Sequence, residues 1–343
     1  MAAAYRKELA PLTAGLADPA EWERKREAIR KQWLELLGGL PDRVPVRFTR
    51  LASAREASHT RHHIRYDTVH GDTVTAYLLV PHIADGSHAH PSWKLPAVMA
   101  LHSTANAGKG DIALASGRDG RRYALELADR GYVVLAPDTI TAGERKAEDA
   151  EYFHTAAFDA EYPEWSAVGK MLADHLQGLD LLCSLPEVDP ERVGAIGHSL
   201  GGYNAYFLAG MDARVKAVVV SCGLSTFHGD PDPNRWGKRD WFTHIPKVTE
   251  LLRADQLSFD FHEIAALAAP RPFFCWIAQQ DQYMPHWKEI GEAAAELHRL
   301  YKYLGCGDRL QAVIGTSGHD FPDPIRNWAY AFLDRWLKKE PQP

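Results

Sequence analysis

Residues 193–209 read VGAIGHSLGGYNAYFLA, in which an apolar run leads into a glycine-rich turn and then into a stretch compatible with a helix. Gly197 and Gly201 flank Ser199 at the spacing Gly-x-Ser-x-Gly. Glycine is needed where a chain turns so sharply from strand to helix that a side chain would collide with nearby backbone. Such a turn exposes the serine hydroxyl and directs the N-terminus of the next helix at it. The pattern therefore predicts that Ser199 is a nucleophile.

On both sides of this turn, strand patterns alternate with helix patterns. The expected strands span residues 97–101, 132–136, 193–196, 215–220, 272–278 and 310–314, and the expected helices span residues 120–130, 164–185, 200–209, 286–303 and a last segment with Asp323 as N-cap and Pro324 at its first position. This alternation is typical of a parallel sheet covered by helices on both faces. Residues 61–69 and 73–80 predict an antiparallel hairpin that precedes it. The expected fold class is α/β, with a mostly parallel sheet of eight strands.

The chain divides into an extension and one main domain. Residues 1–58 are expected to form an N-terminal helical extension, and residues 59–338 the main α/β domain. Within that domain, residues 224–261 interrupt the alternation with prolines, charges and aromatic side chains. This segment is expected to be a small cap-like insertion or pocket wall over the carboxyl edge of the sheet. Its aromatic residues can form an apolar groove or can be plain packing.

The N-terminal extension contains one clear helix pattern. Asp18 and Pro19 are typical of an N-cap and a first helical position, and Gly38 ends the pattern. Trp22 and Trp33 fall on one face of this helix. That face can pack on the main domain or meet a second subunit, so a homo-oligomer is one expected possibility.

Composition excludes several classes of partner. The 39 basic and 45 acidic residues give a formal net charge of −6 without a block of like charge, so nucleic acid and membrane surfaces are poor partners and a small neutral substrate fits better. Residues 1–10 lack a long apolar core, so neither a secretion signal nor a membrane span is expected, and the expected location is cytoplasmic. The four cysteines are far apart and lack ligand spacing, which favours buried free thiols over disulfides or a metal site: Cys183, Cys222, Cys275 and Cys306.

Hydrolysis by a serine requires a base that takes the hydroxyl proton and an acid that orients this base. In a parallel sheet, the groups that meet at a site follow the carboxyl ends of strands. Asp281 follows the strand expected to end at residue 278, and His319 follows the strand expected to end at residue 314. The order Ser199, Asp281, His319 is similar to that of α/β-hydrolases and differs from the orders in the chymotrypsin and subtilisin folds.

Other assignments of the acid and the base stay open. His319 can instead cap the following helix, and Asp281 can be a turn or capping residue. The alternative acids are Asp255 and Asp260, and the alternative bases are His198 and His286. Asp281 is favoured as the acid because the acid must lie beside the last strand. His319 is favoured as the base because a histidine adjacent to the serine, such as His198, points elsewhere, and because His286 comes too early in the chain.

The oxyanion hole is expected to use two backbone N–H groups. One belongs to Leu200, which follows the nucleophile, and the other to the loop after residues 97–101. In that loop Ser103 is the first choice and Thr104 the second. Asp138 and Arg145 can bind substrate, but a buried ion pair that pins their loop is the favoured interpretation.

Six segments follow one another in an order known from a family. They are LHSTANAGKGD (101–111), RGYVVLAPD (130–138), AGER (142–145), SLPEVDPERVGAIGHSLGG (184–202), FDFHEIAALAAPRPFF (259–274) and GHDFP (318–322). Over roughly residues 60–338 the chain resembles the α/β-hydrolase superfamily, in particular its dienelactone-hydrolase-like and acetyl-xylan-esterase-like branch. The resemblance implies the α/β-hydrolase fold and a hydrolase without metal or cofactor that acts through an acyl-enzyme. By position, Ser199, Asp281 and His319 inherit the triad roles.

The chain departs from that branch at three places. Relatives often have His-Gly where this chain has His102-Ser103, dienelactone hydrolases proper use cysteine where it has Ser199, and no obvious glycine precedes Asp281. The second departure argues against the dienelactone reaction itself. The first bears on the geometry of the oxyanion hole, and the third on the choice of the acid.

The function predicted from these observations is that of a serine carboxylester hydrolase for a small-molecule ester, with short-chain or acetyl esters suggested by the resemblance. The alternatives are an amide or peptide hydrolase of the oligopeptidase type and a non-catalytic binding protein with this fold. Because only a neutral imidazole can act as the base, activity is expected to rise with pH.

Overall fold

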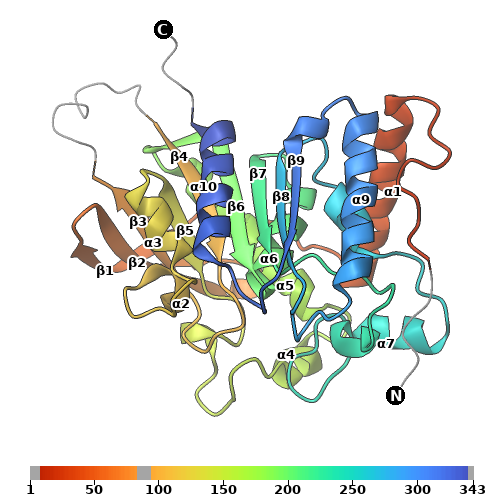
Figure 1. Ribbon diagram of the computed structural model, residues 1–343. Coiled ribbons are helices and arrows are strands. Elements are labelled where there is room, and N and C mark those ends of the chain that lie inside the picture. Colours follow the sequence, from red (N-terminus) through yellow and green to blue (C-terminus); the bar gives the residue numbers. More distant parts are fainter. Residues whose placement is uncertain (1–7, 83–93, 339–343) are drawn as a thin grey trace, which may run out of the picture.

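The structure is a computed structural model that describes residues 8–82 and 94–338. Its sheet has nine strands in the order β1-β2-β3-β5-β4-β6-β7-β8-β9 (Figure 1). The strands are β1 (Phe48–Arg55), β2 (His59–Asp67), β3 (Thr73–Pro81), β4 (Leu95–Leu101), β5 (Val133–Pro137), β6 (Val188–His198), β7 (Val215–Ser221), β8 (Phe273–Ala278) and β9 (Leu310–Gly315). The pairs β1·β2, β2·β3 and β3·β5 are antiparallel, and all pairs from β5 to β9 are parallel. The mostly parallel sheet is therefore confirmed, with nine strands where eight were expected.

The additional strand is β1, and it lies within the segment where only a helical extension was expected. It pairs with β2 over its length, and seven of its eight residues are exposed. Because neither face of β1 is buried, its sequence FTRLASAR has no alternation of apolar and polar residues that would have revealed it. The predicted hairpin, in contrast, is present as β2 and β3.

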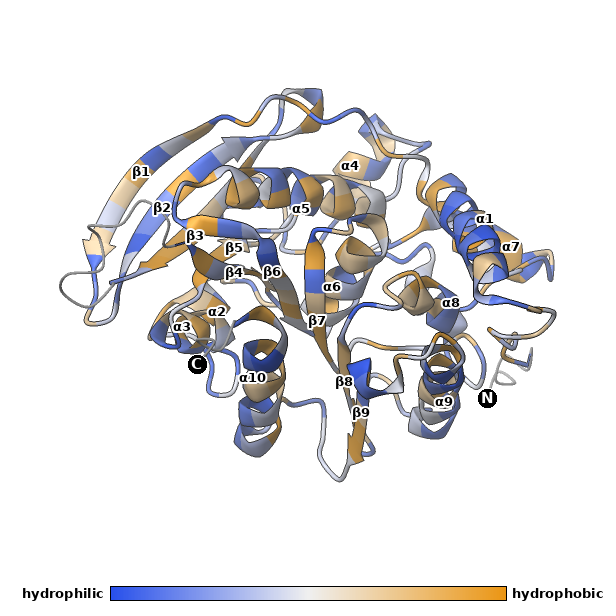
Figure 2. Ribbon diagram, turned by 90° about the horizontal axis from the view of Figure 1, so that it is seen from above, coloured by the Kyte–Doolittle hydropathy of each residue, from blue (hydrophilic) through white to orange (hydrophobic). Residues whose placement is uncertain are grey.

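Helices cover both faces of the sheet, as Figure 2 shows for α3 and α10 on one side and α5 and α6 on the other. The helices are α1 (Pro19–Leu37), α2 (Gly110–Ala113), α3 (Tyr123–Asp129), α4 (Ala156–Glu161), α5 (Ala167–Ser184), α6 (Leu200–Met211), α7 (Pro246–Arg253), α8 (Phe261–Ala266), α9 (Trp287–Tyr303) and α10 (Asp323–Leu337). Residues of α2, α3 and α10 share one buried cluster with the sheet, and residues of α1, α5, α6, α8 and α9 share another. None of the described helices combines the length and the apolar character that crossing a bilayer requires.

The N-terminal helix α1 packs on the main domain. Asp18 caps it by accepting the N–H of Glu21 at 3.1 Å, as expected. Trp22 and Trp33 are fully buried, and the Trp33 ring lies 4.7 Å from that of Phe207 in α6. The tryptophan face of α1 is therefore covered within the same chain.

Two expectations about detail need correction. The last helix begins at Asp323 with Pro322 in the cap position, one residue earlier than expected. The four cysteines are unpaired, but Cys183 is half-buried while the other three are buried. The sequence also predicts a polar loop over residues 82–95, most of which lies outside the described residues.

Candidate active site

Ser199 lies at the turn between β6 and α6 in a strained conformation. Its φ and ψ are 56° and −120°, a combination that non-glycine residues rarely adopt. The backbone packs so closely here that a Cβ on Gly197 would lie 2.1 Å from the carbonyl carbon of Gly201. A Cβ on Gly201 would lie 1.8 Å from the carbonyl oxygen of Leu101. The Ser199 N–H donates to the Ser221 carbonyl at 2.8 Å, which ties the turn to β7.

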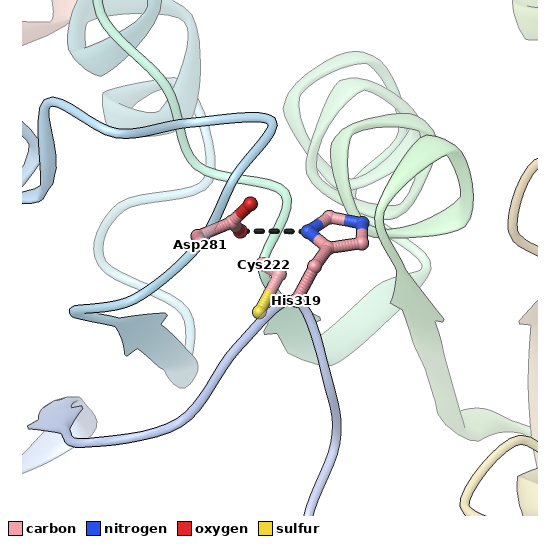
Figure 3. Close-up of side chains that lie close together, drawn as sticks. All are labelled: Cys222, Asp281 and His319. Carbon is pink, nitrogen blue, oxygen red and sulfur yellow. Dashed lines mark hydrogen bonds and ion pairs between the residues drawn. The ribbon is translucent and has the colours of Figure 1, made fainter.

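Asp281 and His319, predicted as the acid and the base, form a hydrogen-bonded pair (Figure 3). The Nδ1 atom of His319 lies 2.6 Å from Oδ2 of Asp281. The other carboxylate oxygen accepts the N–H groups of Tyr283 and Met284 at 2.8 and 3.1 Å. These bonds orient the carboxylate, and the Tyr283 ring lies edge-on against the imidazole at 4.8 Å.

Burial alone would raise the pKa of Asp281. The hydrogen bond and charge of His319, together with the two backbone N–H groups, outweigh burial and hold the pKa of Asp281 below its ordinary value. The carboxylate is therefore ionised at neutral pH. An ionised acid here favours the tautomer of His319 that carries its proton on Nδ1, which leaves Nε2 free to accept one.

Ser199 and His319 line the same pocket, which has a volume of about 550 Å³. Leu200 and Ser103, expected to supply the oxyanion donors, also line it, as does Thr104. In the described part of the chain no hydrogen bond joins the Ser199 hydroxyl to His319. The two groups thus share one cavity, and a catalytic hydrogen bond between such groups often tightens only when substrate binds.

The expected oxyanion donors lie on well-anchored backbone. Leu200 is the first residue of α6, where an N–H has no acceptor within the helix. The Ser103 loop is held by His102, whose Nδ1 donates to the Ser103 carbonyl at 2.7 Å while Nε2 accepts the N–H of Thr139 at 3.1 Å. These two bonds fix the tautomer of His102, and burial lowers the pKa of His102, which stays neutral.

The Ser103 side chain is also bound. Its hydroxyl accepts a hydrogen bond from Nη2 of Arg118 at 2.9 Å and lies 3.5 Å from Oδ2 of Asp111. Arg118 in turn forms an ion pair of 2.7 Å with the buried carboxylate of Asp111. Ser103 is therefore fixed through its side chain as well as its backbone.

The alternative acid and base residues are engaged elsewhere. Asp260 caps α8 and accepts the N–H groups of Phe227 and His228, and Asp255 is exposed. His286 contacts the Thr226 carbonyl through Nε2 at 3.0 Å. His198 does line the pocket, but its Nδ1 contacts the Ser221 hydroxyl at 2.9 Å. Burial holds the pKa of His198 well below its ordinary value.

Asp138 and Arg145 are both buried in ion pairs, but not with each other. Asp138 binds the Lys109 ammonium at 2.6 Å, and Arg145 binds Asp72 at 2.6 Å and Asp174 at 2.8 Å. Between the two expected partners there is only a bond from Arg145 to the backbone carbonyl of Asp138, at 3.3 Å. The expected involvement of Asp138 and Arg145 in buried structural ion pairs is confirmed, but the prediction that they pair with each other is wrong.

Cys222 lies next to the acid–base pair (Figure 3). Its sulfur and ligand atoms of Asp281 and His319 all lie within 4.8 Å of one another. A tetrahedral zinc bound to both Asp281 and His319 would hold their atoms about 3.3 Å apart, so the 2.6 Å contact is that of a hydrogen-bonded pair. Burial raises the pKa of the Cys222 thiol, which contacts the Asp320 carbonyl at 3.4 Å. The sequence around Cys222 gave no indication of this position.

The fold is shared with several solved esterases. A glucuronoyl esterase from Solibacter usitatus matches with a TM-score of 0.73 at 19% identity, over 97% of this chain and 98% of that one. Acetyl xylan esterase 1 from Thermoanaerobacterium matches with a TM-score of 0.59 at 17% identity, over 92% and 98% of the two chains. At these identities the likeness shows the fold alone.

Sequence comparison gives the family. YtaP of Bacillus subtilis, whose name assigns it only to the hydrolases, is 29% identical over 90% of this chain and 98% of its own. Mouse S-formylglutathione hydrolase is 32% identical over 34% of this chain and 49% of its own length. The model of the dienelactone hydrolase family matches residues 86–286, which is more than half of the chain. The chain thus belongs to the dienelactone hydrolase family and is a hydrolase of the carboxylic ester class with the α/β-hydrolase fold.

Proposed function

We propose that this protein hydrolyses esters through Ser199, His319 and Asp281. The observation that carries the proposal is the hydrogen bond of 2.6 Å between His319 and Asp281, because it orients an imidazole in the pocket that also contains Ser199. The strained turn at Ser199 supports it, since such strain is retained where a function requires it.

The chemistry follows from the positions of these groups. His319 Nε2 takes the proton of the Ser199 hydroxyl as the oxygen attacks the ester carbonyl. The N–H groups of Leu200 and Ser103 stabilise the charge on the tetrahedral intermediate. The intermediate expels the alcohol, which takes the proton from His319, and leaves an acyl-enzyme. Water, deprotonated by His319, attacks the acyl group, and the acid is released as Ser199 regains its proton.

The proposed substrates are short-chain or acetyl esters. One wall of the pocket is made by aromatic and histidine side chains, and this wall is buried and packed: Tyr203, Trp236, Phe242 and His244. Tyr203 and His244 are joined by a hydrogen bond of 2.8 Å, which stiffens it. The names of the matched glucuronoyl and acetyl xylan esterases suggest esters on carbohydrates as one class to test.

Replacement of the serine tests the mechanism. Ser199→Ala is expected to abolish turnover of p-nitrophenyl acetate and labelling by a fluorophosphonate, because both need the hydroxyl. Ser184→Ala is the matched control, since Ser184 donates to a carbonyl at the end of α5 and does not line the pocket. Wild-type turnover by Ser199→Ala would rule the mechanism out. Failure of the folded wild-type protein to react with the fluorophosphonate would favour a binding protein instead.

Turnover measurements on further substrates test the preferred acyl length and the preference for esters over amides. We expect kcat/KM to fall from p-nitrophenyl acetate to the butyrate and octanoate, because a packed wall limits the acyl chain. Rates on matched aminoacyl amides above those on the esters would favour a peptide hydrolase.

A further inference from the structure

Among the described residues, the lining of the pocket has more arginine than acidic side chains. Four arginines line it: Arg118, Arg121, Arg235 and Arg239. The first three each lie within 2.8 Å of a carboxylate oxygen, in Asp111, Asp320 and Asp230 respectively. Over residues 8–82 and 94–338, Arg239 has no carboxylate within the 4.0 Å that defines an ion pair. One cation of the lining is therefore not neutralised.

Arg239 is held in place in a way that leaves its guanidinium available. Its Nε donates to the Phe242 carbonyl at 3.2 Å, and its guanidinium carbon lies 4.7 Å from the centre of the Trp241 ring. The Thr243 hydroxyl bonds to both the N–H and the carbonyl of Arg239, which fixes the backbone between residues 239 and 243. Among the described residues, neither of its two Nη groups has a hydrogen-bond partner. The Arg239 side chain is thus held by a hydrogen bond at Nε and by the Trp241 ring against one face of the guanidinium. Its two Nη groups stay available to donate hydrogen bonds to a ligand.

The surroundings make this state costly. Burial lowers the pKa of Arg239, and so does the neighbouring charge of Arg235, whereas Asp232 acts in the opposite direction. Asp232 is the single acidic side chain among the described residues of the lining, and it is exposed. A half-buried cation without a carboxylate partner loses hydration that one hydrogen bond and one ring contact replace only in part. An anion that binds to the Arg239 guanidinium would compensate for the lost hydration.

The shape of the group narrows the class of anion. A guanidinium offers planar, parallel N–H donors that match the two oxygens of a carboxylate. With one unpaired cation and one acidic residue in the lining, a singly charged group is matched better than a phosphate dianion.

We propose that Arg239 binds a carboxylate on the substrate, so that the preferred esters carry a negative charge in addition to the scissile bond. This inference rests on the proposed ester hydrolysis and names its substrate class. Arg239 belongs to the segment over residues 224–261, which thereby supplies specificity while β6, β8 and β9 supply the reacting groups.

Two pairs of matched esters test it. Mono-4-nitrophenyl succinate and its methyl ester place the charge on the acyl side, and 3-carboxyphenyl and 3-carbamoylphenyl acetate place it on the alcohol side. For at least one pair, the ratio of kcat/KM between the anionic and the neutral ester is expected to fall tenfold or more from wild type to Arg239→Gln. Comparing ratios between proteins removes the intrinsic reactivity of each ester. Arg239→Lys is expected to retain part of the ratio.

Lys238→Gln is the control for general electrostatics. It removes a positive charge from the adjacent position, but Lys238 is exposed, pairs with Glu250 and does not line the pocket. It is expected to keep the wild-type ratios. If both members of each pair are hydrolysed and Arg239→Gln leaves the ratios unchanged, the inference is wrong while the proposed function stands.

If none of these esters is hydrolysed, the result counts against the proposed function, and the role of Arg239 is tested by binding instead. Monomethyl succinate and dimethyl succinate can be titrated calorimetrically into Ser199→Ala and into Ser199→Ala/Arg239→Gln. Binding of the monoanion that weakens at least tenfold in the double variant supports the role of Arg239. Equal binding to the two proteins, or none to either, overturns it.

Discussion

Asp281 orients His319 through a single carboxylate oxygen, because its other oxygen is occupied by two backbone N–H groups. We expect Asp281→Asn to lower kcat by about 10³–10⁴-fold with a small change in KM, since an amide favours the wrong tautomer of the imidazole. Asp255→Asn, a change at the exposed alternative acid, should leave steady-state kinetics at the wild-type level. Equal losses in the two variants would show that Asp281 is not the acid.

Arg118 binds the Ser103 hydroxyl and so holds the loop that we propose for the oxyanion hole. Arg118→Met should lower kcat by about tenfold with KM nearly unchanged, because loosening a donor costs less than the 10²-fold or more of its removal. A transition-state analogue such as a trifluoromethyl ketone should lose affinity in proportion to kcat/KM. Arg122→Met, which removes a surface pair with the exposed Asp119, is the control. A loss of thermal stability without a change in kcat would assign Arg118 a purely structural role.

The sequence allows prediction of residues whose position follows from strand order, but not of residues whose position depends on tertiary contacts. The closeness of Asp281 and His319 could be predicted because each follows the carboxyl end of a predicted parallel strand, and such ends meet at one edge of the sheet. The partner of Asp138 could not, since Lys109 reaches it from a different loop. The guanidinium of Arg239, which has no carboxylate partner among the described residues, could not be predicted either, because the sequence does not show which arginines pair with a carboxylate.

At the scale of elements, α1 belongs to the core through its tryptophans. Trp33 is fully buried and contacts Phe207 of α6, so Trp33→Ala should lower the free energy of unfolding by about 3–5 kcal/mol. Trp328, which is 48% exposed on α10, offers a matched control whose replacement by alanine should cost much less. Chemical denaturation of the three proteins measures both values. Similar losses for the two variants would mean that α1 is not integral to the fold.

The buried strands were predictable because each is a short continuous apolar run, and helices such as α1 and α9 because their apolar residues recur on one buried face. The boundaries of α5 and α9 differ from expectation by a few residues, as fraying ends usually do. Short helices such as α4 and α7 were not predicted, since six to eight residues carry too few turns for a clear period.

For the whole molecule, buried neutral histidines make stability depend on pH. Burial lowers the pKa of His175 to about 3, so in the folded state it stays neutral at pH 5 while in the unfolded state it is protonated below about 6.5. The unfolded state then binds more protons, and the free energy of unfolding falls as pH drops through 6.5. This residue alone should account for about 2 kcal/mol between pH 7 and pH 5.

His175→Leu tests this dependence, because leucine cannot take up the proton in the unfolded state. Its free energy of unfolding should change less between pH 7 and pH 5 than that of wild type, by about 2 kcal/mol. Urea denaturation at the two pH values provides the measurement. An unaltered pH dependence in His175→Leu would contradict the assignment.

The outermost strand β1 has a consequence for how copies of the protein meet. A free strand edge offers unpaired N–H and C=O groups onto which another chain can add a strand. In β1 the register with β2 shifts between Arg50 and Ala52, a bulge that bends the edge, and Arg50 is exposed next to it. Strand addition would have to accommodate this irregularity beside a hydrated guanidinium. We therefore expect the irregular edge to disfavour aggregation by sheet extension.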